Sequence, residues 1–296
     1  MCMSCLFLCA KHKQFTKLSL KNMDIHYNIL LGVCTVVGIR NKTGYWRHKM
    51  QYYIPTKVYQ EIDAVKVHAE ELSDYGSCAL IVTGKYSARA NGALADVEAA
   101  LNVYGKKHVQ YDEIEENPSV ETVMKATEFG KRNGVDYVIA IGGGSPMDAA
   151  KAIAIMLANP EENADYLYES VAHTKALPVV TIPTTCGTGS EVTGVAVLTV
   201  HAKRTKASLP HRVFPVLALA DPKYLKTASR KVIGQTAIDA LGHMIESYLN
   251  RTATDYSRMF VAQGLKVWAR SKDALLGMRE ITDEDYSNFL LASTLA

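Results

Sequence analysis

Short apolar segments alternate with amphipathic segments through the middle of this 296-residue chain, and this alternation limits the fold more than any other feature. The runs "CALIVTG", "YVIAIGGG" and "LPVVTIP" are continuously apolar and of strand length, and helical patterns such as "SVETVMKATEFGKRNG" separate them. Strands that are apolar on both faces and are joined by helices are typical of a parallel sheet covered on both sides. We therefore predict a doubly wound α/β domain with a mainly parallel sheet.

The alternating pattern sets the expected domain boundaries. It begins near residue 50, includes a predicted helix over 61–76, and ends after "VLALADP", near residue 222. Three helical stretches follow, at roughly 230–249, 255–271 and 283–296. We expect residues 1–49 to be a non-native or disordered leader, residues 50–226 to be a dinucleotide-binding domain, and residues 227–296 to begin an all-helical domain that is incomplete here.

Charge and cysteine usage exclude several classes of partner. The net charge of +3 comes from interspersed lysines and acids, so we expect neither nucleic acid nor a membrane as a partner. The run "ILLGVCTVVGI" has about half the length needed to cross a bilayer. Four of the six cysteines lie in the first 49 residues, which is not a disulfide framework. A reducing, cytoplasmic location fits this composition.

The segment "YVIAIGGGSPMDAAK" predicts a phosphate-binding turn between a buried strand and a helix. Glycine permits backbone angles that other residues resist, Ser145 is placed to cap the helix with Pro146 at its first position, and Asp148 can return a hydrogen bond to the turn. Amide groups at the positive end of a helix bind pyrophosphate without a lysine. The candidate ligands are Gly142, Gly143, Gly144, Ser145 and Asp148. A tight turn with no ligand is the alternative.

A second polar segment follows the next predicted strand. In "TIPTTCGTGSEVT", hydroxyl groups and small residues gather at the carboxyl end of that strand, and the candidate binding residues are Thr184, Thr185 and Thr188. Ligands of open α/β sheets bind at such carboxyl ends. The second half of a dinucleotide could lie there.

Four motifs in order carry a resemblance to a known family: "GGGSPMDAAK", "IPTTCGTGSEVT", "ALADP" and "AIDALGHMIESY". From about Tyr52 to Ala296 the chain resembles the iron-containing (group III) alcohol dehydrogenases, in particular their butanol dehydrogenase-like members. The resemblance implies a nicotinamide dinucleotide, with the glycine turn at the pyrophosphate and the threonines towards the nicotinamide. It also implies that Asn117 lines the adenosine cleft and that Lys206 lies near the nicotinamide end. The implied reaction is reversible hydride transfer between this coenzyme and a primary alcohol or aldehyde.

The segment "IVTGKYSARANGA" bears on the choice of coenzyme. An acidic residue at the end of this strand would bind a ribose 2′-hydroxyl and repel a 2′-phosphate, and the position is Gly84. Lys85, Ser87 and Arg89 offer donors nearby. We therefore predict a preference for NADP(H) over NAD(H), the alternative being that the two basic residues are solvated loop charges.

Asp239 and His243 lie four positions apart on a predicted helix and so share one face. Such a pair taken alone is more often a salt link or a core histidine. The resemblance implies instead that the pair binds Fe²⁺ or Zn²⁺ together with two histidines from later segments. No histidine or cysteine follows Met244, so we expect those ligands beyond Ala296 and a C-terminally incomplete chain.

Two alternatives to a butanol-type alcohol dehydrogenase remain open. One is a catalytically silent fragment that binds NADP without turnover, because two protein ligands rarely hold a catalytic ion tightly. The other is a relative of glycerol dehydrogenase or dehydroquinate synthase, which also combine a glycine-rich turn with a metal. The expected partners are a small alcohol or aldehyde and a second copy of the chain in a homodimer.

Overall fold

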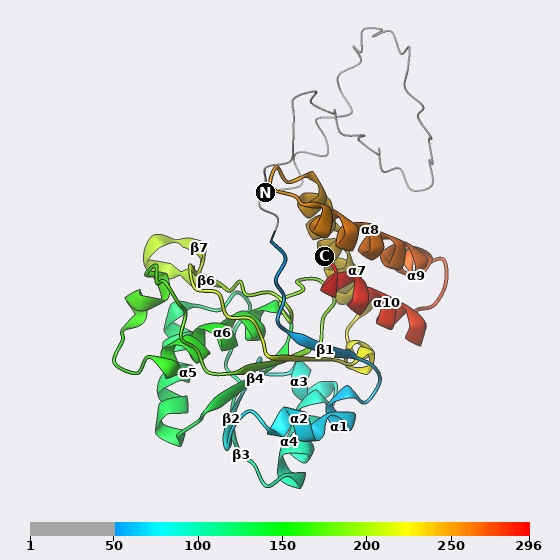
Figure 1. The fold of residues 1–296 in the computed structure, drawn as a ribbon. Coiled ribbons are helices and arrows are strands. Elements are labelled where there is room, and N and C mark those ends of the chain that lie inside the picture. Colours follow the sequence, from blue (N-terminus) through cyan, green and yellow to red (C-terminus); the bar gives the residue numbers. More distant parts are fainter. Residues whose placement is uncertain (1–50) are drawn as a thin grey trace. The chain divides into compact units, whose positions relative to one another are not determined.

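The computed structural model describes residues 51–296 (Figure 1), so the leader predicted for residues 1–49 lies outside the described residues. The strands are β1 (Lys57–Gln60), β2 (Cys78–Thr83), β3 (Lys107–Tyr111), β4 (Tyr137–Gly142), β5 (Val179–Pro183), β6 (Val197–Val200), β7 (Thr205–Ser208) and β8 (Leu217–Ala220). The helices of the first part are α1 (Ala64–Val67), α2 (Ala69–Ser73), α3 (Ser87–Ala90), α4 (Ala93–Val103), α5 (Val120–Asn133) and α6 (Gly144–Ala158). The later helices are α7 (Arg230–Leu249), α8 (Asp255–Arg270), α9 (Lys272–Leu275) and α10 (Asp283–Thr294), and short 3₁₀ helices cover Ala164–Tyr168, His201–Lys203 and Pro222–Leu225.

Six strands form one parallel sheet in the order β1-β8-β5-β4-β2-β3, and β6 and β7 form a separate antiparallel hairpin. Every residue of β2, β4, β5 and β8 is buried. Side chains such as Leu80 and Val138 pack with α5 and α6 on one face, and Ile81 and Ile139 pack with α1, α2 and α4 on the other. These observations confirm the parallel sheet with helices on both faces.

The crevice that can hold a ligand follows from the strand order. β2 and β4 are neighbours, with Thr83 opposite Ile141, yet the helix after β2 covers one face of the sheet and the helix after β4 covers the other. A point where the connections diverge in this way opens a crevice beyond the carboxyl ends of the two strands. Gly84 and Gly143 are the first residues after these strands, so both candidate coenzyme segments border the crevice.

The predicted helix over 61–76 is wrong in one respect, because the structure divides it into α1 and α2 at His68. The His68 ring stacks on Tyr59, with 3.4 Å between ring centroids, and its Nε2 lies 2.5 Å from Glu61. The His68 side chain thus packs on the edge strand β1, and the apolar face predicted for one long helix is interrupted at this residue.

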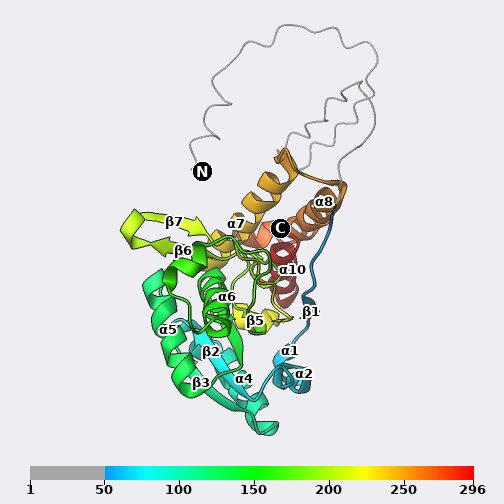
Figure 2. The same ribbon diagram turned by 60° about the vertical axis from the view of Figure 1, so that its left-hand side comes forward.

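The three predicted C-terminal helices correspond to α7, α8 and α10 (Figure 2), and α9 is an additional turn between α8 and α10 (Figure 1). A separate apolar cluster joins α7 and α10 to the end of the sheet, and it includes Cys186, Ala220, Leu225, Ile233, Ala237, Phe289 and Leu290. A domain boundary at 226/227 stays a prediction. Among the helices within residues 51–296, none is both long and apolar enough to cross a membrane.

Candidate active site

The glycine turn joins β4 directly to α6. Gly142 has φ +152°, and a Cβ atom there would lie 2.6 Å from Cγ of Pro146, so only glycine fits without strain. α6 begins at Gly144 with Gly143 as its N-cap, and no side chain caps it. The prediction that Ser145 caps this helix is therefore wrong. The first amide groups of a helix have no partner inside the helix, so they remain suited to an anion.

Ser145 instead holds the neighbouring loop. Its Oγ accepts a hydrogen bond from the backbone amide of Asn117 over 3.1 Å. Asn117 adopts φ +58°, a left-handed conformation that asparagine tolerates better than most residues. The hydroxyl predicted to cap the helix thus fixes the Asn-Pro segment beside the turn.

Residues 181–193, "TIPTTCGTGSEVT", form the threonine segment, which lies directly against the glycine turn of residues 142–144. A Cβ atom on Gly143 would lie 2.8 Å from Oγ1 of Thr185, and one on Gly144 would lie 2.8 Å from Cγ2 of Thr188. Thr184 is buried, and its amide donates to the carbonyl oxygen of Gly142 over 2.9 Å. The two candidate segments therefore form one continuous wall, and the glycines are required for this close approach.

Asp148 differs from its expected role. Its carboxylate accepts hydrogen bonds from Ser190 Oγ over 2.7 Å and from the Val197 amide over 2.9 Å, so it binds the threonine segment and the β6–β7 hairpin and not the turn. Burial raises the pKa of this carboxyl group, although Lys151 opposes the shift. The prediction that Asp148 returns a hydrogen bond to the turn is wrong because its partners come from distant segments of the chain.

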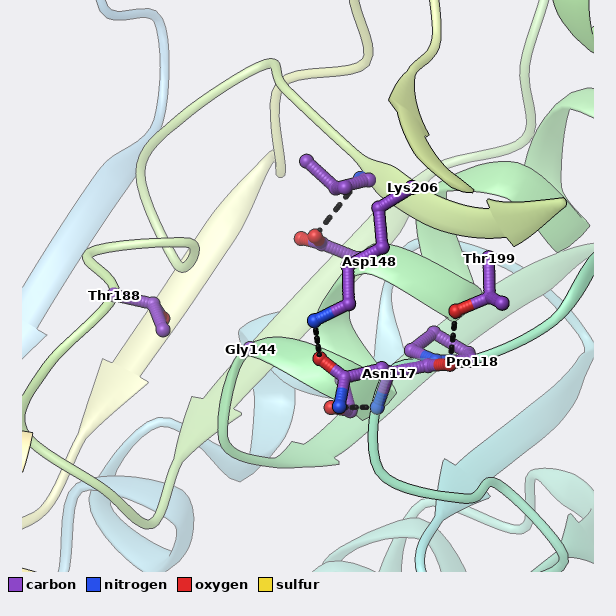
Figure 3. A pocket seen from close by; sticks show the side chains of 9 residues that line it. Asn117, Pro118, Gly144, Asp148, Thr188, Thr199 and Lys206 are labelled. Atoms are coloured by element: carbon purple, nitrogen blue, oxygen red, sulfur yellow. Dashed lines mark hydrogen bonds between the residues drawn. The ribbon is translucent and has the colours of Figure 1, made fainter. Parts of the chain in front are cut away.

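A pocket of about 190 Å³ lies where the turn, the Asn-Pro segment and the hairpin meet (Figure 3). Its lining residues are Asn117, Pro118, Gly144, Ser145, Asp148, Thr188, Val197, Thr199 and Lys206. Small-molecule pockets usually start at roughly 300 Å³, so this pocket suits one part of a dinucleotide.

Asn117 and Lys206 meet in this pocket, although the resemblance placed them towards opposite ends of the coenzyme. Nζ of Lys206 donates to Oδ1 of Asn117 over 2.7 Å, and Thr199 Oγ1 donates to the Asn117 carbonyl over 2.8 Å (Figure 3). Val197 and Thr199 of β6 also line the pocket, although nothing in the sequence indicates it. No local pattern marks them, since only the folded hairpin brings them to the turn.

On the other side of the crevice, Gly84 follows β2 and is partly buried. A Cβ atom there would lie 3.3 Å from the carbonyl oxygen of Ile114. Lys85 and Ser87 are exposed, whereas Arg89 donates to Oε1 of Gln110 over 3.1 Å. The predicted donors thus follow the end of β2 in the chain, and one of them, Arg89, is hydrogen-bonded to Gln110 of the neighbouring strand β3.

The predicted metal ligands project from α7 towards the threonine segment. Nδ1 of His243 lies 3.0 Å from the carbonyl oxygen of Gly187, and since a carbonyl only accepts, Nδ1 carries the hydrogen. Nε2 then keeps its lone pair for a metal, which is how metal-binding histidines are usually oriented. A Cβ atom on Gly187 would lie 3.1 Å from Oδ2 of Asp239, so both side chains reach the same glycine.

Asp239 and His243 therefore fit a divalent metal as two of its ligands. Among residues 51–296, no cluster of three or more His, Cys, Asp or Glu side chains is arranged to hold a metal ion. A tightly bound catalytic ion usually has three protein ligands, so these two residues alone would not complete such a site.

Comparison with known proteins identifies the family. The family model for iron-containing alcohol dehydrogenases matches residues 55–222. The chain is 35% identical over 219 residues to a long-chain primary alcohol dehydrogenase of Thermoanaerobacter ethanolicus, covering 73% of this chain and 55% of that protein. It is 32% identical over 247 residues to the NADH-dependent butanol dehydrogenase A of Clostridium acetobutylicum, covering 83% of this chain and 63% of that protein.

Solved structures agree with this assignment. The crystal structure of an iron-containing alcohol dehydrogenase from Thermotoga maritima superposes with a TM-score of 0.77 at 36% identity, over 83% of this chain and 67% of that one. The chain spans between half and two thirds of the length of the two enzymes from Thermoanaerobacter and Clostridium. From its matched sequence and its fold, the chain belongs to the iron-containing alcohol dehydrogenase family.

Proposed function

We propose that this chain carries the coenzyme site and part of the metal site of a metal-dependent alcohol dehydrogenase or aldehyde reductase. The observation that carries the proposal is the position of the threonine segment between the two sites. On one side Thr185 and Thr188 contact the glycine turn, and on the other Gly187 meets Asp239 and His243. A coenzyme lying along this segment would bring its reactive ring next to the metal pair.

The protein groups have separate tasks in the proposed reaction. The amides of the glycine turn bind the pyrophosphate, and Lys206 places a cation in the adjoining pocket. Asp239 and His243 would hold Fe²⁺ or Zn²⁺, which when bound polarises the oxygen of a primary alcohol or aldehyde. The threonine segment sets the distance between coenzyme and substrate, because it contacts both groups of residues.

We also propose that NADP(H) is preferred over NAD(H). Gly84 places no carboxylate at the end of β2, and Lys85 and Ser87 are exposed beside it. The butanol dehydrogenase of Clostridium acetobutylicum is named as NADH-dependent, so relatives of this chain differ from this preference. Fluorescence titration with NADPH and with NADH tests it directly, and tighter binding of NADH would contradict it.

A second candidate is an NADP-binding protein without turnover. The described residues supply two metal ligands and no larger cluster, which favours it. Butanal reduction by NADPH should be measured with added Fe²⁺ or Zn²⁺, with dihydroxyacetone and a sugar-acid phosphate as competing substrates. Metal-dependent reduction of butanal supports the dehydrogenase. NADPH binding without reduction of any of the three supports the silent candidate.

A further inference from the structure

Lys151 is a fully buried lysine on α6, one helical turn beyond the pocket residue Asp148, and the reaction proposed above does not use it. Its Nζ donates to Ser190 Oγ over 2.7 Å and to the carbonyl oxygen of Val195 over 2.8 Å. Asp148 Oδ1 lies 3.8 Å away. A buried ammonium group is costly unless partners surround it, so this arrangement is specific.

The partners of Lys151 connect three walls of the pocket. Ser190 Oγ accepts from Lys151 and donates to Asp148 over 2.7 Å, and the Ser190 amide donates to Thr188 Oγ1 over 3.3 Å. Asp148 in turn accepts from the amide of Val197, the first residue of the hairpin that carries Lys206. Through these hydrogen bonds the ammonium group links α6, the threonine segment and the β6–β7 hairpin.

We propose that Lys151 is a positioning residue for the coenzyme: its charge holds Ser190 and Asp148 so that Thr188 and the hairpin stay at the distance that a bound pyrophosphate requires. This inference rests on the proposed coenzyme site. It differs from a general packing role, because it requires the positive charge and not only the volume of the side chain.

The charge of Lys151 should be lost within an accessible pH range. Burial lowers the pKa of Lys151 to about 8, against the opposing attraction of Asp148 and Glu191. These are the charged groups that face it, Asp148 from α6 itself and Glu191 from the threonine segment. Glu191 is buried, and its Oε1 accepts from Thr294 Oγ1 over 2.7 Å. The lysine is thus mostly protonated at neutral pH and neutral in mild alkali.

The test is the dissociation constant for NADPH, measured by fluorescence titration of the full chain between about pH 7 and about pH 9.5, which spans the expected titration. In the wild-type protein, affinity should fall as pH rises through the titration of Lys151. Lys151→Met should weaken binding at neutral pH by at least about tenfold and remove the pH dependence. Lys125→Met on α5, an exposed lysine, is the matched control and should keep the wild-type profile.

Ser190→Ala provides a second variant in case Lys151→Met does not fold. The Ser190 hydroxyl accepts a hydrogen bond from the charged lysine and so favours the charged form. Without it the lysine should lose its proton at lower pH, and the affinity for NADPH should begin to fall at lower pH than in the wild type. A flat wild-type profile, or a fall that persists in Lys151→Met, would overturn the inference and leave the proposed function intact. Absence of NADPH binding by the wild-type chain would overturn both.

Discussion

The imidazole of His243 and the carbonyl oxygen of Gly187 form a 3.0 Å hydrogen bond between α7 and the threonine segment. The bond fixes the ring so that Nε2 points away from the segment with its lone pair available. Since Gly187 also adjoins Asp239, both proposed ligands lie beside a single backbone position.

Replacing either proposed ligand should remove metal binding and leave coenzyme binding intact. His243→Ala and Asp239→Ala should each weaken Zn²⁺ binding by at least about tenfold in calorimetric titration, because a two-ligand site cannot spare one ligand. Glu246→Gln, an exposed acid on the same helix, should bind Zn²⁺ like the wild type. Equal Zn²⁺ affinity of His243→Ala and wild type would exclude the pair as the metal site.

A side chain on the glycine turn should block the coenzyme. In Gly143→Ala the new methyl group lies 2.8 Å from Thr185 Oγ1, so the threonine segment must move. We expect NADPH affinity to fall by at least about tenfold, which corresponds to about 1.4 kcal/mol.

The double variant Gly143→Ala, Thr185→Ala gives the matched control. It removes the atoms that meet the new methyl group, so it should bind NADPH more tightly than Gly143→Ala alone. The single variant Thr185→Ala completes the comparison. If the loss of affinity in the double variant equals the sum of the losses in Gly143→Ala and Thr185→Ala, contact between these two segments does not govern binding.

An acidic residue at the end of β2 should reverse the coenzyme preference. Gly84→Asp would place a carboxylate where the 2′-phosphate is expected, and like charges should weaken NADPH binding by at least about tenfold while NADH binding is kept. Gly84→Ala is the control for the Cβ atom, which would lie 3.3 Å from the Ile114 carbonyl oxygen. An unchanged ratio of the two dissociation constants in Gly84→Asp would place the 2′-position elsewhere.

Two helical glycines should respond to alanine with opposite signs. Nothing lies within 4 Å of a Cβ atom on Gly234 of α7, so Gly234→Ala should raise the free energy of unfolding by about 0.5–1 kcal/mol. On Gly264 of α8 the Cβ atom would lie 2.7 Å from Sδ of Met244, and overpacking should cost about 1–3 kcal/mol. Urea unfolding measures both, and the same sign for both would contradict the packing of α7 on α8.

Acid should weaken the start of α10. Asp285 accepts from Arg279 over 2.7 Å and from the Thr282 amide over 2.8 Å, and these donors hold the pKa of Asp285 well below its usual range. A lowered folded-state pKa stabilises the protein above the unfolded-state pKa of about 3.9 and loses that contribution as pH falls below it.

Asp285→Asn tests this sign. It should lower the free energy of unfolding at neutral pH by about 0.5–2 kcal/mol, through loss of the charged partner in the capping box. The difference from wild type should shrink between about pH 5 and about pH 3. A difference that grows on acidification would show that another group controls the acid response.

The course of the sheet was predictable because its signal is local. "YVIAIG" is a short apolar run followed by glycines, which favours a strand buried on both faces over a helix, and β4 is such a strand. Bounds of α5, α7 and α8 follow from caps within the same segment, such as Ser119 and Thr254.

The site was predicted only in part because its contacts are long-range. The sequence places Ser145 as the cap of its own helix, but its hydroxyl accepts a hydrogen bond from the Asn117 amide. The hydrogen-bond partners of Asp148 lie more than forty residues away in the sequence. Lys151 belongs to the alanine-rich helix α6, and no neighbouring residue in the sequence indicates that it is buried. Its burial depends on Ser190 and Val195, which no periodicity connects to it.

The pairing of β1 with β8 has a consequence for biosynthesis. Lys57 lies opposite Leu217, so the first strand of the sheet pairs with the last. At about 5–20 residues per second, the ribosome needs roughly 10–30 seconds to make the intervening stretch. During that time β1, whose sequence KVYQ includes no buried residue, has no strand to pair with, so its place in the sheet is filled only after β8 has been made.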